Sequence, residues 1–180
     1  MKKPAILYFL LSFIILAGLL TLIFTSFPKN IDRTFEAVKY RLGAENADYM
    51  EKTSYMIKGK YSHSLFGHSF KGVIYENGEP ISAFNNDDYD VTINFDETNQ
   101  GLLYITGEYV SLISYGTIYI DQKFNQIAIS LFEQAEDSAA NEKTWNSADG
   151  LMIAGPAATR EEALDISNEL MKEVIHKPLE

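Results

Sequence analysis

Residues 5–27 form an apolar run that contains no charged side chain. As a helix, these residues would extend over about 34 Å, which is enough to cross a hydrocarbon core of about 30 Å. The end of the run, residues 22–27, has bulky side chains where a signal peptidase requires small ones. Residues 1–27 are therefore predicted to be a cytoplasmic tip and a retained transmembrane anchor. A cleaved signal peptide is the alternative.

The basic residues on either side of this run bear on its orientation. Lys2 and Lys3 precede it, whereas Lys29 and Arg33 follow it as a counterweight. Basic residues close to a membrane helix favour the cytoplasmic side. With Lys2 and Lys3 inside, we expect a single-pass protein of the cell membrane whose C-terminal domain lies outside.

Residues 28–50 are predicted to form a juxtamembrane amphipathic helix and a linker. Apolar residues follow one another here at spacings of four, three and four, as on one face of a helix: Ile31, Phe35, Val38 and Leu42. Gly43 then provides a helix stop.

Between residues 52 and 132 the apolar pattern changes to a period of two, which is typical of strands. Val91, Ile93 and Phe95, for example, alternate with polar residues. The pair Asn77-Gly78 predicts a two-residue hairpin turn, because a type I′ turn needs positive φ at both central residues. Candidate strand segments, of which five to seven are expected to form the sheet, lie at residues 55–61, 66–75, 81–84, 91–95, 102–110, 111–120, 126–132 and 151–154. Because no helices separate most of them, they predict an antiparallel meander.

The C-terminal segment predicts one further helix. Thr159 and Glu162 have the spacing of a capping box. An apolar stripe follows at helical spacing, formed by Ala163, Ile166, Leu170 and Val174. The predicted fold class is therefore α+β: an N-terminal transmembrane helix, then a meander sheet of five to seven strands with the C-terminal helix packed on one face. The extracytoplasmic α+β domain is predicted to comprise residues 51–180.

Charge and composition exclude several classes of function. The chain carries 15 basic and 25 acidic residues, and its net charge is −10. An acidic domain is repelled by phosphate backbones, so nucleic acid is not expected as a partner. The chain has no cysteine, which removes thiol nucleophiles, disulfides and thiolate metal ligands.

Two histidines, His63 and His68, suggest a metal site, because imidazoles bind zinc and copper. Their separation of five is an odd number. On one continuous strand they would therefore point to opposite faces. We therefore interpret them as structural histidines and predict no metal ligands.

Serine chemistry has little support in the sequence. His68 and Ser69 are adjacent, and neighbours on a strand face opposite ways. Ser26 and Lys29 match a Ser-x-x-Lys pattern only by spacing and lie at the membrane edge. The elbow motif Gly-x-Ser-x-Gly is absent. No catalytic or cofactor-binding residue is predicted, and no cofactor is expected.

Acidic side chains concentrate in residues 72–122, most densely at 85–90 and 96–101. Calcium requires six to eight oxygen ligands on a bent loop, which both segments could supply. Solvated hairpin turns are the simpler interpretation. Trp145, in a polar segment, is expected to fold onto the sheet, with an exposed sugar- or peptide-binding aromatic as the alternative.

These observations predict a membrane-anchored extracytoplasmic domain with a non-catalytic interaction or accessory role in the cell envelope. Its expected partners are the membrane, through residues 5–27, and another envelope protein that is complementary in charge. A carboxylate-dependent hydrolase of cell-wall or carbohydrate material is one alternative. A regulator or sensor that acts through a membrane partner is another.

Overall fold

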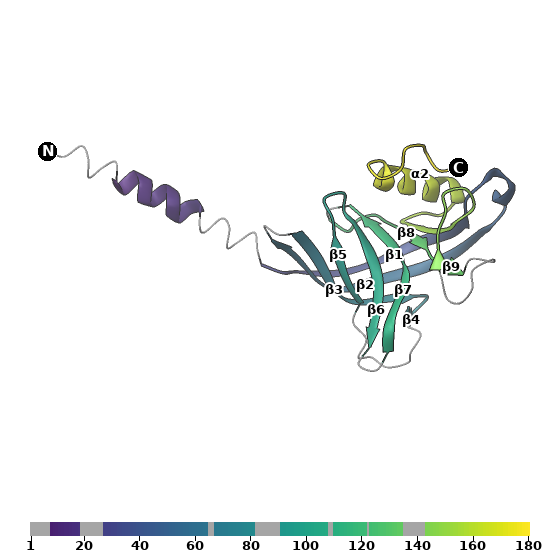
Figure 1. Ribbon diagram of the computed structural model, residues 1–180, viewed down its shortest axis with the longest axis horizontal. Helices are drawn as coiled ribbons and strands as arrows, with labels where there is room; N and C mark the ends of the chain where they lie inside the picture. The colour runs from purple at the N-terminus through teal and green to yellow at the C-terminus, as the bar shows by residue number, and fades with distance from the viewer. Residues whose placement is uncertain are drawn as a thin grey trace.

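The computed structural model describes residues 8–18, 27–64, 67–81, 91–107, 110–121, 123–134 and 143–180. Residues 8–18 are helical, and the remainder is mostly strand (Figure 1). The further elements are β1 (Lys29–Arg41), the short 3₁₀ helix η1 (Ala44–Asn46), β2 (Met50–Ser64), β3 (Gly67–Glu76), β4 (Glu79–Pro80), β5 (Val91–Phe95), β6 (Gln100–Gly107), β7 (Val110–Ile120), β8 (Ile127–Leu131), β9 (Glu133–Gln134), β10 (Lys143–Thr144), β11 (Leu151–Gly155) and α2 (Arg160–Met171).

Eight antiparallel strands close into a β-barrel. The strands follow the order β2-β1-β11-β8-β7-β6-β5-β3, and the pairing of β2 with β3 completes the circle. Sequential strands are therefore neighbours throughout, as the predicted meander requires. The expected five to seven strands are too few, however, because residues 29–41, predicted as a helix, form the additional strand β1 and pair with β11.

The hairpin predicted at Asn77-Gly78 is present. Both residues have positive φ, 51° and 84°, and Glu76 pairs with Glu79 across the turn. The return strand β4 is only two residues long and pairs with β3 alone. The strand predicted at residues 81–84 does not begin at residue 81, which is a bend, and residues 82–84 lie outside the described residues.

The helix predicted within residues 28–50 is wrong, because Lys29–Arg41 is strand β1. Phe35 and Ala37 face the barrel interior, whereas Val38 and Tyr40 face α2 on the outside. Both faces of the C-terminal half of this strand are thus buried, and apolar residues on two opposite faces produced a spacing that resembles a helix. The barrel therefore begins at β1 rather than near residue 51.

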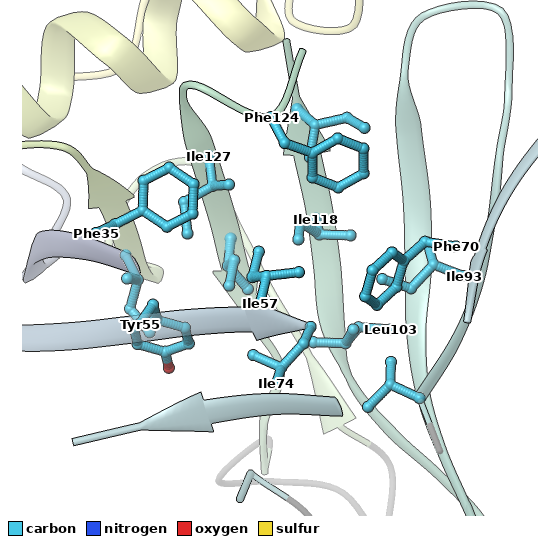
Figure 2. Packing of buried hydrophobic residues seen from close by; sticks show 14 of the residues in the cluster. Phe35, Tyr55, Ile57, Phe70, Ile74, Ile93, Leu103, Ile118, Phe124 and Ile127 are labelled. Carbon is cyan, nitrogen blue, oxygen red and sulfur yellow. The ribbon is translucent and has the colours of Figure 1, made fainter. Parts of the chain in front are cut away.

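Apolar side chains fill the barrel interior (Figure 2). Large side chains point inward from β1, β2, β3, β5, β6, β7 and β8, and these are Phe35, Ile57, Phe70, Ile93, Leu103, Ile118 and Ile127. An eight-stranded barrel is just wide enough for such side chains to fill it. The interior is therefore a packed core.

Phe124 lies over one end of this core, in the turn between β7 and β8. Its ring contacts Tyr61, Phe70 and Phe95, with ring centres 5.1–6.2 Å apart. Its backbone has φ 54°, and the Asp121 carboxylate accepts hydrogen bonds from the backbone amides of residues 125 and 126. The tight turn thus directs an aromatic ring into the barrel end.

Helix α2 packs on the outside of the barrel against β1, β8 and β11 (Figure 1). The predicted cap is present, because Thr159 Oγ1 accepts from the Glu162 amide at 3.2 Å. The reciprocal bond of the predicted capping box is shifted by one residue, since Glu162 Oε2 accepts from the Ala158 amide at 2.7 Å and not from that of Thr159. The buried face consists of Ala163, Ile166, Ser167 and Met171, whereas Leu170 is only half-buried. Every residue of β8 and β11 is buried, since the core covers one face and α2 the other.

The C-terminal tail returns to the barrel after α2. Asn168 forms two hydrogen bonds with the backbone of Leu179, at 2.7 and 3.2 Å. The Gly43 amide donates to the Glu180 carbonyl at 2.7 Å. The tail therefore holds the segment that follows β1.

Among the residues that the structure describes, no helix is both long and apolar enough to cross a membrane.

Candidate functional site

A polar groove of about 620 Å³ lies beside the barrel, where β1 ends and β11 begins. Four segments line it: the end of β1, the 3₁₀ helix η1, the small β9–β10 sheet and the turn before β11. Its lining residues are Arg41, Glu45, Asn46, Glu133, Gln134, Thr144, Trp145, Asn146, Asp149 and Gly150. We call it the Arg41 groove.

Arg41 connects two walls of this groove. Its guanidinium donates to Glu133 Oε1 at 2.6 Å and to the Asp149 carbonyl at 2.8 Å, and it lies over the Tyr49 ring. The hydrogen bond to Glu133 raises the pKa of Arg41 above its usual value. Both side chains of the ion pair are partly exposed, so the pair orders the groove more than it stabilises the fold.

Arg160 supports the groove from behind. From the first turn of α2, its guanidinium donates to the Arg41 carbonyl at 3.1 Å. It also lies over the Tyr40 ring, 5.8 Å from the ring centre. The end of β1, and with it the Arg41 side chain, is thereby fixed to the helix.

Trp145 and the turn after it form the other wall. Asn146 Oδ1 accepts from the amides of Ala148 and Asp149 at 2.8 and 3.1 Å, and its Nδ2 donates to the Asp149 carboxylate. The indole of Trp145 lies against Gly150, where a Cβ atom would be only 2.3 Å from Nε1. Trp145 folds onto the α2 side of the barrel, as expected. Its Nε1 atom is buried and has no hydrogen-bond partner among the described residues.

The groove combines chemistry suited to polar ligands. Three carboxylates, those of Glu45, Glu133 and Asp149, share it with one guanidinium. Amide side chains in the lining, such as that of Gln134, add directional hydrogen bonds. Of these residues the sequence singled out only Trp145, because the lining comes from segments distant in the chain that meet only when β1 pairs with β11.

The histidines behave differently from the sequence-based expectation. His63 and His68 lie on different strands and are direct partners in the β2–β3 register, with ring centres 4.6 Å apart. The two side chains do not point to opposite faces as predicted, because they lie on two paired antiparallel strands and not on one strand. Ser69 follows His68 on the same strand β3, and Ser26 lies outside the described residues.

The acidic segment that begins at Asp96 forms a hairpin turn. One Asp96 oxygen accepts from the Thr98 amide and hydroxyl at 2.8 and 2.7 Å, and the other accepts from Gln100 Nε2 at 2.7 Å. Burial raises the pKa of Asp96, but these hydrogen bonds outweigh it and leave the pKa below its usual value. A calcium ion would therefore compete with the turn for this carboxylate. Residues 85–90 lie outside the described residues.

A second polar cluster, which sequence reasoning missed, lies near the β4 end of the barrel. The hydroxyls of Tyr55 and Tyr115 are 3.2 Å apart, and that of Tyr115 donates to Glu76 Oε2 at 3.3 Å. Burial raises the pKa of Tyr55 and, to about 12, that of Tyr115. Both hydroxyls therefore stay protonated at neutral pH and connect the core to a carboxylate at its edge.

No protein-family model matches the chain, and no curated protein or solved structure is similar enough to count as a match.

Proposed function

We propose that the chain is a membrane-anchored, non-catalytic binding domain of the cell envelope, and that the Arg41 groove docks a basic segment of another envelope protein. The observation that carries this proposal is the groove itself, a concavity of about 620 Å³ lined by three carboxylates and one guanidinium. The filled interior supports it further, because barrels that carry a ligand inside keep room for it.

Charge supports a basic partner. Arg41, the one cation among the described residues that line the groove, already binds Glu133. The carboxylates of Glu45 and Asp149 remain as the acidic surface of the groove, in a chain whose net charge is −10. Complementary charge steers encounter and selects partners. A lysine- or arginine-rich segment meets this requirement.

The membrane assignment rests on residues 5–27. The large apolar side chains of residues 8–18 are exposed, Phe9 and Ile14 at 72% and 66%. A lipid bilayer would cover these apolar side chains and remove them from water. We expect protease added to intact spheroplasts to degrade the domain while the N-terminus of the mature chain remains Met1. Protection of the domain until permeabilisation, or a mature N-terminus near residue 28, would contradict this topology.

A defined probe tests the groove. The full chain in detergent is titrated with a labelled lysine-rich peptide, followed by fluorescence anisotropy, and with a glutamate-rich peptide of the same length as a control. Glu45→Gln together with Asp149→Asn should weaken lysine-peptide binding at least tenfold, and added salt should weaken it in the wild type. Glu161→Gln, an exposed acid on α2 outside the groove, should leave it unchanged. Equal loss in the α2 variant, or no loss in the groove variant, would refute the docking site.

One observation favours a hydrolase as the second candidate: the groove brings three carboxylates together, as a paired-carboxylate mechanism requires. We expect wild-type protein to release no soluble sugar from purified cell-wall polymer. Release that is lost in both Glu45→Gln and Asp149→Asn would support the enzyme and displace the binding function.

A further inference from the structure

His63 and His68 form a cross-strand pair at the end of the β2–β3 hairpin. They are direct register partners, and their ring centres are 4.6 Å apart with an angle of 59° between the ring planes. His63 is exposed and His68 is half-buried. The pair is therefore accessible to solvent and held by two backbones that are already paired.

Tyr61 fixes the orientation of one ring. Its hydroxyl lies 2.9 Å from His68 Nδ1, and its own ring is buried against Phe124. In the tautomer in which Nδ1–H donates to the tyrosine oxygen, Nε2 of His68 keeps its lone pair. Metal-binding histidines use their second nitrogen in this way, and the partner sets both tautomer and ring orientation.

The spacing of the rings agrees with shared coordination. Two imidazoles that bind one ion at about 2.0–2.1 Å, with about 90–110° between the bonds, have ring centres about 4.5–5.2 Å apart. The observed 4.6 Å lies within this range. Among the described residues, no group of three or more His, Cys, Asp or Glu gathers around one point. Water would therefore occupy the remaining coordination positions.

We propose that His63 and His68 bind a divalent first-row transition metal ion, with Tyr61 as the positioning residue. A site of two imidazoles whose other coordination positions are held by water suits Cu(II) best. Copper has the highest affinity for such ligands among the divalent first-row metals, and Zn(II) binds more weakly. Binding needs neutral imidazoles and weakens on acidification, because protons compete for the same nitrogens.

The test is a calorimetric titration of the full chain in detergent, purified without a histidine tag, with Cu(II) and then Zn(II). We expect one Cu(II) per chain. His63→Asn and His68→Asn should each weaken binding at least tenfold. His176→Asn is the matched control, because it removes the remaining histidine, which is exposed in the C-terminal tail, and it should leave the affinity unchanged.

Tyr61→Phe separates a metal site from a packed pair of rings. It keeps the ring in the core and removes only the hydroxyl, so circular dichroism should be unchanged while Cu(II) affinity falls about tenfold. The copper absorption band should shift with it. The proposal is overturned if wild-type protein shows no saturable copper binding, or if either single histidine variant binds copper as tightly as the wild type.

Discussion

The Tyr40 hydroxyl donates a hydrogen bond of 2.7 Å to Ser167 Oγ, joining the first strand of the barrel to the last helix across 127 positions of sequence. Both residues are fully buried. The same hydroxyl lies 3.4 Å from the Ala163 carbonyl. Because neither polar group can reach water, this bond specifies how α2 docks on β1.

Tyr40→Phe should lower the free energy of unfolding by about 1–3 kcal/mol, because it leaves the Ser167 hydroxyl buried without its donor. Ser167→Ala should also lower the free energy of unfolding, because it leaves the Tyr40 hydroxyl buried without its acceptor. The double variant should lose less than the two single losses together, since the pair is removed as a unit. Urea unfolding of residues 28–180, followed by the fluorescence of Trp145, measures all three. If the double variant loses as much free energy of unfolding as the two single variants together, the hydrogen bond does not couple the two residues.

The sequence predicted most of the fold because β strands with one polar face leave a clear pattern. Val91, Ile93 and Phe95 are buried and alternate with exposed residues, as expected. Strand β1 was missed because Phe35 faces the core and Val38 faces α2. A strand covered on both faces has no period of two to detect.

Little of the two candidate sites could be predicted, because each depends on register or closure. His63 and His68 become partners only through the β2–β3 register. Arg41 meets Glu133 only after the barrel closes. Neither relation follows from local periodicity. The capping box at Thr159 could be predicted because all its atoms lie within one helical turn.

Phe124→Ala should destabilise the domain by about 3–5 kcal/mol, because it empties the end of the core where Tyr61 and Phe95 contact this ring. Lys123→Ala is the matched control: its side chain is exposed in the same turn, so the change should stay within about 0.5 kcal/mol. The measurement is the urea concentration at the midpoint of unfolding, compared between variants whose free energy of unfolding depends on urea concentration with the same slope. A Phe124→Ala variant as stable as the control would show that the turn does not close the barrel end.

Helix α2 offers a graded test of its docking. Met171→Ala should cost about 2–5 kcal/mol, because Met171 is fully buried, and Leu170→Ala should cost less, because Leu170 is half-buried. Thr159→Ala should cost about 1 kcal/mol through loss of the cap. Exposed Glu169→Ala should stay within about 0.5 kcal/mol. Thermal unfolding of the four variants gives the order of their stability losses. If Met171→Ala loses no more stability than Glu169→Ala, the helix is not docked on the barrel.

Alkaline pH should unfold the domain through its buried tyrosines. Burial raises the pKa of Tyr40 to about 12, although the hydrogen bond to Ser167 and the charge of Arg160 act in the opposite direction. The ordinary value for tyrosine is about 10, so between about pH 10 and 12 the unfolded chain releases a proton that the native state retains. The stabilisation is complete below about pH 10 and is lost as the pH rises through the folded pKa.

The free energy of unfolding of residues 28–180 should therefore fall steeply from about pH 10 upwards. Tyr40→Phe should make this decline shallower, even though the variant is less stable at neutral pH, because one of the linked protons is gone. Tyr49→Phe is the matched control, since the Tyr49 side chain is exposed, and it should keep the wild-type slope. Urea titrations at a series of pH values measure the slopes. An unchanged slope in Tyr40→Phe would show that the Tyr40 hydroxyl ionises as readily in the folded barrel as in the unfolded chain, which contradicts the rise in its pKa on burial.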